Sequence, residues 1–455
     1  MSTATETGFD RRLLPPMLLG AALNPVNSSI ISVSLVPIGA AFGAPPAETA
    51  WLVSALYLAT AIGQPVVGRL IDLFGPRDLF LAGAALTGIS GVVGMLAPGF
   101  GVLVASRVLL GFGTCAGYPA AMHLIRSEAR RTGKDSPAGV LTALAITTQT
   151  IAVVGPSLGG LLIGIGGWRA TLAINIPLAL AGLYLGFRRL PATPATRRDG
   201  RLVRELDLPG MGLFAAALVC LLLFLMDVRG GDWWLLAVTV AAGAGFTWRE
   251  LRTRQPFIDV RLLGGNLPLL ATYGRALLSF VVSYAFLYGY TQWMEQGHGL
   301  SASEAGLVLL PLFGVGIIAS TVTGRSKAVR GKLLIGSLGQ VAACALLLFL
   351  NDGSPVWMLL AVVIVLGVPQ GLNNLALQNS VYHQAHAERM GSSAGLLRTF
   401  GYLGAIVASA ANGAFFGRRA DSAGLHHLAA FMLVVSVLFL VLTVADRSLS
   451  RVGRT

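Results

Sequence analysis

Runs of about twenty apolar residues recur along the whole chain, and they constrain its fold more than any other feature. A helix needs roughly 17–25 such residues to cross the hydrocarbon core of a bilayer. Inside that core a segment must satisfy its own backbone hydrogen bonds, which only helices and closed barrels achieve. The sequence therefore predicts an all-α polytopic membrane protein with fourteen transmembrane helices, near residues 13–35, 49–67, 78–97, 101–123, 138–163, 169–187, 206–226, 233–250, 267–291, 304–323, 333–350, 357–380, 392–416 and 428–445.

Composition excludes a soluble protein. The 455-residue chain has 55% hydrophobic and 12% charged residues, whereas soluble domains carry about 25% charged residues. The net charge of +13 does not indicate nucleic acid as a partner, because the bases lie in short loops between apolar runs and do not form one basic face. We expect a lipid bilayer as the surroundings and no nucleic-acid partner.

The basic residues orient the predicted helices. With the N-terminus placed inside and sides alternating, inside segments hold 26 Lys and Arg residues and outside loops hold 4. Such a bias is what the positive-inside rule requires. The sequence therefore predicts a multi-pass protein of the plasma (inner) membrane with both termini in the cytoplasm.

Two long basic segments, 187–207 and 249–261, bracket the seventh and eighth predicted helices. They predict an N-terminal six-helix bundle (1–190), basic linkers with an inserted hairpin (191–262) and a C-terminal six-helix bundle (263–455). Gly68-Arg69 after the second helix is repeated as Gly324-Arg325 after the tenth, which indicates related halves. Parallel halves with a binding site between them at mid-membrane are a transporter architecture.

The turn at 68–77 is short, charged and rich in glycine. It resembles the loop between the second and third helices of the major facilitator superfamily, Gly-x-x-x-Asp-Arg-x-Gly-Arg-Arg/Lys, although Leu73 and Pro76 depart from that pattern. The resemblance implies a role in gating for Gly68, Asp72, Gly75 and Arg77. We expect Asp72 to meet the N-terminus of the thirteenth helix, or a nearby Arg, in the outward-facing state, because a helix N-terminus attracts negative charge.

The fourth and fifth helices carry two further motifs of that superfamily. Arg107-Val-Leu-Leu-Gly111-Phe-Gly113 resembles its Arg-x-x-x-Gly-x-Gly motif. The glycines suit either close packing or function, whereas a charge inside the bilayer favours function for Arg107. The fifth helix carries Gly-Pro-x-x-Gly-Gly, which resembles the motif of exporters. Its proline bends the helix, and the motif implies a conformational role for Gly155, Pro156, Gly159 and Gly160.

After the fifth helix, Trp168-Arg169-Ala-Thr-Leu172-Ala-Ile-Asn175-Ile-Pro177 resembles the pattern Trp-Arg-x-x-Phe-x-Ile-Asn-x-Pro of the fourteen-helix drug:proton antiporter family. With the fourteen predicted helices, the chain is identified as a member. The resemblance implies a monomeric secondary-active exporter of small amphipathic molecules, with alternating access. A proton gradient is then the expected energy source, and we expect no cofactor and no metal. No cluster of carboxylate, His or Cys side chains indicates an enzyme.

The first helix departs from the family, whose members carry an Asp there. Asn24 and Asn27 occupy this region. They either line a cavity as neutral groups or satisfy the backbone opened by Pro25. On the twelfth helix, residues 370, 374 and 378 share one face, so Asn374 and Gln378 form either a wet cavity wall or a contact between helices. Three aromatic residues near the outer end of the ninth helix are interpreted as an interface belt, namely Tyr284, Tyr288 and Trp293.

Three arginines lie inside predicted helices: Arg107, Arg275 and Arg398. No acidic residue lies near the middle of any of these helices, so a cavity lined by arginines should disfavour cations. The sequence predicts a neutral or anionic amphipathic substrate, contacted by Arg107 and Arg275. In the alternative, the arginines bond to carbonyls and amides and the cavity is effectively neutral. The candidates for carrying protons are Glu48, Asp72 and Glu295. A non-transporting receptor or scaffold on the same fold is the other functional class.

Overall fold

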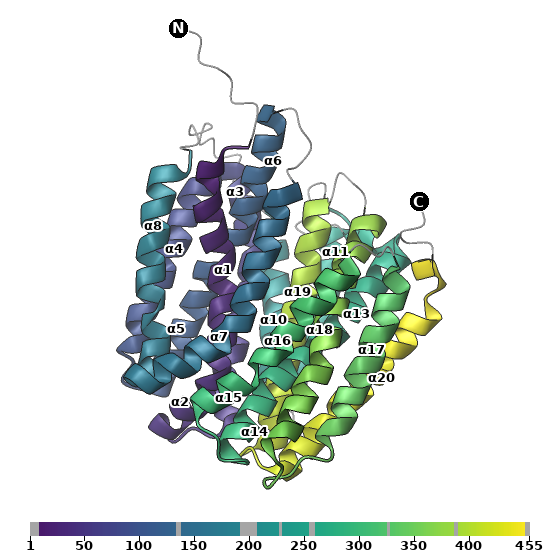
Figure 1. The fold of residues 1–455 in the computed structure, drawn as a ribbon. Coiled ribbons are helices and arrows are strands. Elements are labelled where there is room, and N and C mark those ends of the chain that lie inside the picture. The colour runs from purple at the N-terminus through teal and green to yellow at the C-terminus, as the bar shows by residue number, and fades with distance from the viewer. Residues whose placement is uncertain are drawn as a thin grey trace.

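The computed structural model is helical throughout the residues that it describes, namely 9–132, 138–191, 207–226, 230–253, 260–324, 328–385 and 390–450. The helices run nearly side by side, so that consecutive long helices point in opposite directions (Figure 1). The α-helices are α1 (Leu14–Ile30), α2 (Leu35–Phe42), α3 (Pro46–Phe74), α4 (Pro76–Met95), α5 (Phe100–Thr114), α6 (Gly117–Thr132), α7 (Ala138–Ala173), α8 (Asn175–Arg189), α10 (Leu208–Met226), α11 (Trp233–Glu250), α12 (Val260–Gly264), α13 (Leu267–Ala285), α14 (Thr291–Gln296), α15 (Ala302–Val308), α16 (Leu310–Gly324), α17 (Val329–Leu347), α18 (Val356–Gln384), α19 (Met390–Phe416) and α20 (Ser422–Ala445).

Four short segments extend these helices. Three are 3₁₀ turns: η1 (Arg11–Leu13), η2 (Ile31–Val33) and η6 (Arg447–Ser450). The fourth, η4 (Phe286–Tyr290), is a π-helical turn that joins α13 to α14. Turns of this kind inside a longer helix are frequent at functional sites.

The prediction of fourteen membrane-spanning helices is not confirmed. In the described residues, ten helices are long and apolar enough to cross a membrane, or up to twelve if each of two bent pairs is one span. The bent pairs are Arg11–Val33 with Leu35–Phe42 and Val154–Ala173 with Asn175–Arg189. The predicted eighth helix is present as α11, but it ends on Arg249 and Glu250, which shortens its apolar part. The chain is nonetheless a multi-pass protein.

Glycines break the chain where it must turn sharply. Gly75 has a φ of 89°, a left-handed value that other residues avoid, and it separates α3 from α4. Pro76 then occupies the first position of α4, where a missing N–H costs nothing. Gly167 has a φ of 69° and interrupts α7 between its long first part and its last turns.

The helices form two groups on either side of a central seam (Figure 1). Helices α1 to α8 pack mainly among themselves, as do α13 to α20. Between the groups, α3 packs against α19, and α7 packs against α15 and α16. We call the two groups the N-half and the C-half. The predicted domain limits at 190 and 262 stay predictions.

The hairpin of α10 and α11 lies beside the seam. Helix α10 contacts α3 of the N-half and α19 of the C-half. Ser54 of α3 donates to Met226 Sδ of α10 at 3.6 Å. Two further α10 residues, Leu218 and Leu222, belong to the same buried cluster as residues of both halves. The hairpin therefore covers one side of the place where the halves meet.

Candidate substrate cavity and its seals

The halves meet closely at the end of the molecule opposite the chain termini, which we call the closed end. Here α7 packs against α15 through the Gly-Pro-x-x-Gly-Gly motif. Ser157 Oγ donates to Gly306 O at 3.0 Å, and Ser303 Oγ donates to Gly160 O at 2.8 Å. A Cβ placed on Gly160 would lie 2.8 Å from Ser303 Cα. Only a residue without a side chain permits this approach of the two backbones.

The motif also packs inside the N-half. A Cβ on Gly155 would lie 2.5 Å from Ser29 Cβ, and one on Gly159 would lie 2.7 Å from Val33 Cγ2. Both contacts are with the α1–η2 helix. The motif is therefore held between α1 on one side and α15 on the other, which is how a single stretch of α7 can couple the two halves.

The second contact of the closed end joins α3 and α19. Ser409 Oγ donates to Ala50 O at 2.8 Å, and Ala47 N donates to Gly417 O at 3.1 Å. A Cβ on Gly413 would lie 3.2 Å from Ala47 Cα. As at α7 and α15, a small residue brings two backbones together across the seam.

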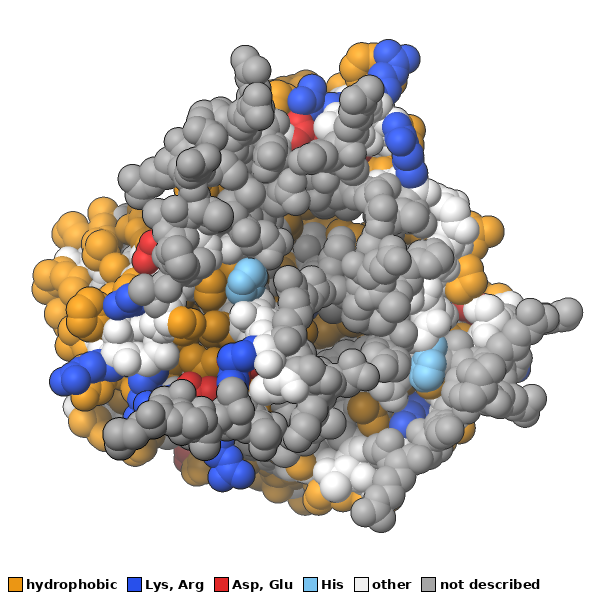
Figure 2. All heavy atoms as spheres, turned by 90° about the horizontal axis from the view of Figure 1, so that it is seen from above, with side chains coloured by type: hydrophobic (Ala, Val, Ile, Leu, Met, Phe, Trp, Pro, Cys, Tyr) orange, Lys and Arg blue, Asp and Glu red, His pale blue; other side chains and the backbone are white. Residues whose placement is uncertain are grey.

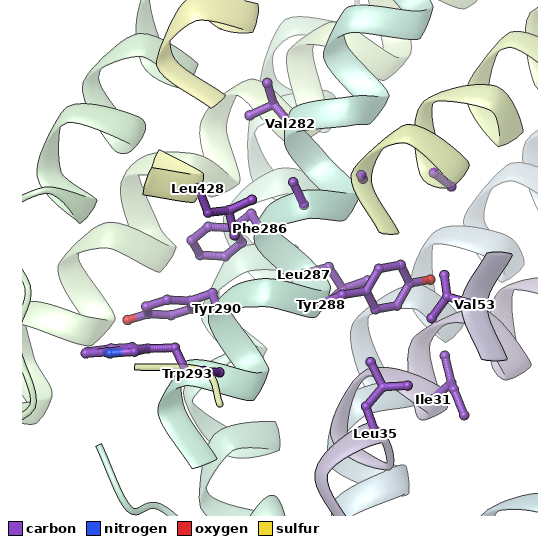
Figure 3. Packing of buried hydrophobic residues seen from close by; sticks show 14 of the residues in the cluster. Ile31, Leu35, Val53, Val282, Phe286, Leu287, Tyr288, Tyr290, Trp293 and Leu428 are labelled. Atoms are coloured by element: carbon purple, nitrogen blue, oxygen red, sulfur yellow. The ribbon is translucent and has the colours of Figure 1, made fainter. Parts of the chain in front are cut away.

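Aromatic and aliphatic side chains fill the closed end between these contacts. Figure 3 shows Leu287 and Tyr288 pointing toward Ile31, Leu35 and Val53 of the N-half. On the other side of the same helix, Tyr290 and Trp293 point toward the C-half (Figure 3), where Trp293 Nε1 donates to Ser422 Oγ at 3.1 Å.

The interpretation of Tyr284, Tyr288 and Trp293 as an interface belt is wrong for the last two residues. Tyr288 and Trp293 are 1% and 0% exposed, so neither reaches a lipid headgroup region. Tyr284 is half-buried and stacks on Tyr288, with ring centroids 5.8 Å apart. A spacing of four residues places Phe280, Tyr284 and Tyr288 on one face of the helix, and this spacing is the signal in the sequence that indicates their contact.

Four tyrosines from both halves meet at the centre of the seam, and we call Tyr57, Tyr284, Tyr288 and Tyr402 the tyrosine cluster. Tyr57 stacks on Tyr402 with ring centroids 5.6 Å apart, and it meets Tyr284 edge-on at 5.2 Å. The Tyr57 and Tyr288 hydroxyls are 3.0 Å apart. Sequence reasoning did not bring these residues together, because they come from α3, α13, η4 and α19.

Arg107 lies behind the tyrosine cluster in the N-half. It is 1% exposed, and its Nε donates to Leu52 O of α3 at 3.0 Å. Within the described residues its Nη2 has no hydrogen-bond partner. Tyr57 and Tyr288 are its electrostatic neighbours. The contact with a carbonyl favours the alternative in which this arginine is bonded within the protein, and its predicted contact with substrate stays a prediction.

The glycines of the fourth-helix motif have a packing role. Cβ atoms placed on them would each collide with a different neighbour: Gly111 with Leu56 O of α3 at 2.6 Å, and Gly113 with Thr87 N of α4 at 2.8 Å. Four residues further along, Gly117 meets Gly20 of α1, whose Cα would lie 2.8 Å away. The motif thus lets α5 and α6 approach three other helices of the N-half.

The two asparagines of α1 have different surroundings. Asn27 is buried, and it exchanges two hydrogen bonds with Asn175 at 2.7 and 2.8 Å. Asn24 is half-buried and donates to Thr114 Oγ1 at 3.2 Å. Pro25 leaves the Ala21 carbonyl, four residues earlier, without its helical N–H, whereas the hydrogen bond from Ser29 Oγ at 2.7 Å goes to the carbonyl of Pro25 itself. Asn27 therefore ties α1 to α8, whereas Asn24 remains accessible to a cavity.

Arg275 forms an ion pair at the end of the molecule that carries the termini, which we call the termini end. Its fully buried guanidinium binds Asp446, which follows α20. Asp446 also accepts from Ser448 N at 2.9 Å. The predicted contact of Arg275 with substrate stays a prediction, but its guanidinium has a carboxylate partner in this structure.

Arg398 differs from both of these arginines. It is half-buried on α19, and its Cζ lies 3.5 Å from the centroid of the Tyr118 ring on α6. Electrostatic interactions connect it with Tyr284 and Tyr402 of the tyrosine cluster. No ion pair of Arg398 is found among the described residues. The Arg398–Tyr118 contact joins the two halves at mid-depth.

The amides of α18 become more exposed toward the termini end. Gln370 Oε1 accepts from Ser283 Oγ of α13 at 2.7 Å. One turn further, Asn374 is half-buried, and it accepts from Gln378 Nε2 at 2.9 Å. Gln378 itself is exposed. The residues on this predicted shared face therefore become more accessible toward the termini end.

The halves part toward that end. On α3, residues 50 to 61 are mostly buried, whereas residues 64 to 68 are half-buried. A Cβ on Gly68 would meet no atom within 4 Å. Seen from this end, the molecule is hollowed near its centre, with hydrophobic side chains inside (Figure 2). We call this recess the central cavity.

The turn between α3 and α4 contacts its own half. Arg77 Nη2 donates to Phe187 O of α8 at 3.1 Å, and its guanidinium lies 5.2 Å from the Phe187 ring. The backbone of Asp72 is part of α3, but its side chain lies outside the described part of the structure. The predicted contact between Asp72 and α19 therefore stays a prediction.

The other two candidate proton carriers lie at the closed end. Glu48 is exposed in the first turn of α3. Glu295 is half-buried in α14, which contacts α2 and η2 of the N-half. Its Oε1 is buried and has no hydrogen-bond partner among the described residues. Of the two, only Glu295 lies where opening of the seam would change its solvation.

Comparisons with known proteins agree with this architecture. The family model of the Major Facilitator Superfamily matches residues 17–409. The chain is 32% identical to the uncharacterized MFS-type transporter YwoD of Bacillus subtilis (strain 168), over 95% of this chain and 96% of that protein. It is 27% identical to the tetracenomycin C resistance and export protein of Streptomyces glaucescens, over 91% of this chain and 78% of that protein.

A solved structure shares the fold. The crystal structure of an auto-inhibited POT family peptide transporter superposes with a TM-score of 0.65 at 16% identity, covering 96% of this chain and 97% of that one. The family model spans most of the sequence, and the first relative is similar along nearly its whole length. The chain thus belongs to the Major Facilitator Superfamily, and it is a membrane transporter of small molecules and not an enzyme.

Proposed function

We propose that this transporter is a secondary-active exporter of small amphipathic molecules that works by alternating access. One observation carries the proposal: the halves are joined at the closed end by two glycine-containing helix contacts, while the central cavity opens at the termini end. Such an arrangement is one of the two states that alternating access requires, because a rocking motion of the halves would close one end and open the other.

The direction of export follows from the predicted orientation. If both termini face the cytoplasm, as the bias of basic residues requires, the central cavity is open to the cytoplasm in this structure. A substrate would then enter from the cytoplasm or the inner leaflet. The resistance and export function in the name of the Streptomyces glaucescens relative supports this direction.

We further propose proton antiport with Glu295 as the carrier at the closed end. One carboxyl oxygen of Glu295, Oε1, is buried without a hydrogen-bond partner among the described residues, which disfavours the charged form while the seam is closed. Opening the closed end would hydrate Glu295 and release its proton. Glu48 is a matched control, since it is a glutamate at the same end but exposed. Asp72 is retained as a third candidate.

Transport by purified protein in liposomes tests both parts. A pH gradient and a membrane potential are imposed separately, and efflux of cationic, neutral and anionic amphipathic compounds is measured. We expect movement driven by the pH gradient, lost in Glu295→Gln and kept in Glu48→Gln. Downhill exchange that survives in Glu295→Gln would identify a coupling defect and not a folding defect.

Two results would contradict the proposal. A receptor or scaffold would move no compound under any gradient, in which case the fold serves another purpose. If the transported compound moves only down its own gradient, the proton-coupling part of the proposal is wrong. The protein would then be an exporter of a neutral or anionic metabolite without proton coupling. The same transport measurements, repeated at several protein-to-lipid ratios, test the expectation that the protein works as a monomer, because the rate per molecule should then stay constant.

A further inference from the structure

We propose that Arg398 and the tyrosine cluster form a binding site for planar aromatic acids, that is, for an aromatic ring system that bears a carboxylate or an ionised phenol. This inference rests on the proposed export function and names its substrate class. Three arginines lie inside the membrane-spanning helices. One of them, Arg398, is suited to bind an external anion.

Two of the three arginines are engaged elsewhere. Arg107 is 1% exposed, has Tyr57 and Tyr288 as electrostatic neighbours and donates to the Leu52 carbonyl. Arg275 is neutralised by Asp446 at the end of α20. An anionic ligand that approached Arg275 would compete with a carboxylate already in place.

Arg398 is half-buried and has no carboxylate partner among the described residues. Tyr118 covers a face of its guanidinium, with Cζ 3.5 Å from the ring centroid. Stacking on an aromatic ring holds a guanidinium in place and leaves its N–H edge clear of that ring. Part of this edge lies within hydrogen-bonding reach of the Tyr402 side chain. That edge presents parallel donors, which match a carboxylate or a similar planar anion.

Tyr284 supplies the accessible aromatic part of the site, because the other three members of the tyrosine cluster are buried. Tyr284 and Tyr402 are the electrostatic neighbours of Arg398. Tyr284 is half-buried and continues into Phe280, with ring centroids 6.0 Å apart and an interplanar angle of 23°. Rings arranged in this way favour a flat aromatic ligand, which gains from offset stacking as well as from burial.

The sign of the ligand charge follows from what surrounds the cluster. The charged side chains that act on its four tyrosines are Arg107 and Arg398, and no described carboxylate is among them. In a medium of low dielectric constant, these two cations penalise a cationic ligand and favour an anionic one. The amides Asn374 and Gln378 of α18, in the same half as Arg398, are neutral hydrogen-bonding groups.

A pair of probes that differ only in charge tests this assignment. Binding and proteoliposome transport are measured at pH 7 for 2-naphthoate and 2-naphthamide, with tetraphenylphosphonium as a cationic comparison. The variants are Arg398→Gln, Arg398→Lys and Tyr118→Leu. The control is Arg252→Gln, because Arg252 also stacks on an aromatic ring, at 4.3 Å from that of Trp248, but is exposed in the turn that follows α11.

We expect Arg398→Gln to weaken 2-naphthoate binding by about 10- to 100-fold, the size of a lost charge-assisted hydrogen bond. The same change should leave 2-naphthamide within about threefold and should improve binding of the cation. Arg398→Lys keeps the charge but loses the planar edge, so its affinity for 2-naphthoate should lie between that of the unaltered protein and that of Arg398→Gln. Tyr118→Leu should weaken 2-naphthoate less than Arg398→Gln, and Arg252→Gln should change nothing.

Equal losses for acid and amide in Arg398→Gln, or no loss for the acid, would overturn the assignment. So would tighter binding of tetraphenylphosphonium than of 2-naphthoate by the unaltered protein. In these cases transport of the amide or cation would still support the export function. If the unaltered protein moves none of the three probes and none of the wider set of amphipathic compounds, the proposed function fails and this inference fails with it.

Discussion

The two ends of this transporter are held together by different kinds of interaction. At the closed end glycine, serine and alanine bring the backbones of the two halves together, with the backbone itself as a partner in the pairs Ser157–Gly306 and Ser409–Ala50. At the termini end, the ion pairs that the structure describes join residues within one half or within the hairpin, as in Arg275–Asp446 and Glu128–Arg131. The contacts at the closed end therefore depend on side-chain volume, whereas those at the termini end depend on charge.

This contrast indicates how the two halves can move relative to each other. A seal made of small residues can separate without leaving unpaired charges, because each lost contact exposes only a few backbone or hydroxyl groups. Charged pairs inside one half keep that half rigid while it moves. The comparison predicts that changes of side-chain volume affect the closed end, whereas changes of charge affect the termini end.

The largest effect is expected at the Arg275–Asp446 pair. Asp446→Asn leaves the fully buried guanidinium of Arg275 without its counter-ion, and the loss of one partner of such a pair costs about 3–5 kcal/mol. Thermal or denaturant unfolding in detergent measures the change. The double variant Arg275→Met/Asp446→Leu is the control, and it should recover most of the loss, since apolar replacement of both partners is often neutral. A single variant within about 1 kcal/mol of the parent protein would mean that the pair is solvated.

A smaller effect is expected from Gly155→Ala at the contact between α7 and α1. The added Cβ would lie 2.5 Å from Ser29 Cβ, and overpacking of this kind costs about 1–3 kcal/mol. Gly164→Ala on the same helix is the matched control, because its Cβ would meet only Ser303 Oγ at 3.6 Å. There the helix preference for Ala should stabilise the protein by up to about 1 kcal/mol. Effects of the same sign in both variants would contradict the packing account.

How far the sequence predicted these features depends on how local they are. Glycine at 75 and the proline after it marked a helix break, because both residues act on their own backbone. The motifs in α5 and α7 were correctly located, although only the structure shows that Gly155 faces α1 while Gly160 faces α15. Which helix a small residue approaches is a property of the assembled bundle.

The central site was less predictable for the same reason. Tyr57 and Tyr402 are 345 positions apart, and nothing local indicates that they stack. Asn27 pairs with Asn175 of the family motif, a contact that neither segment suggests alone. The pairing of Arg275 with Asp446 was not predicted, because Asp446 follows the last apolar run and lies outside the predicted helices. Aromatic residues near a predicted helix end were interpreted by their place in the membrane and not by their spacing.

Pro156→Ala tests whether the closed end depends on helix shape as well as on volume. The proline interrupts the backbone hydrogen bonds of α7, and its carbonyl lies next to Gly306, whose Cβ would be 2.7 Å from Pro156 O. A straighter α7 should lose this fit and slow transport several-fold, while the protein still inserts and folds. Transport in proteoliposomes measures the rate, and unfolding in detergent monitors stability. A normal rate would mean that the motif serves packing alone.

The smallest effect is expected at Glu128 near the N-terminal end of the chain, and it concerns pH. Hydrogen bonds from Arg131 hold the pKa of this carboxyl below its ordinary value, helped by the Asp10 N–H at 3.1 Å and opposed by partial burial. A carboxyl whose pKa is lowered by folding adds stability above its unfolded pKa, about 4.3, and loses it as pH falls through the folded value.

Glu128→Gln should therefore cost less than about 1 kcal/mol at pH 7, because Arg131 is half exposed and the pair is screened by solvent. The difference in unfolding free energy between parent and variant should shrink as the pH is lowered below about 4.3. Arg131→Gln should remove most of the same pH dependence, since it removes the main cause of the lowered pKa. A difference that grows on acidification would mean that Glu128 is bound as the neutral acid. The volume changes at the closed end involve no titrating group, so their effects should stay constant over the same pH range, and that contrast separates the two ends most directly.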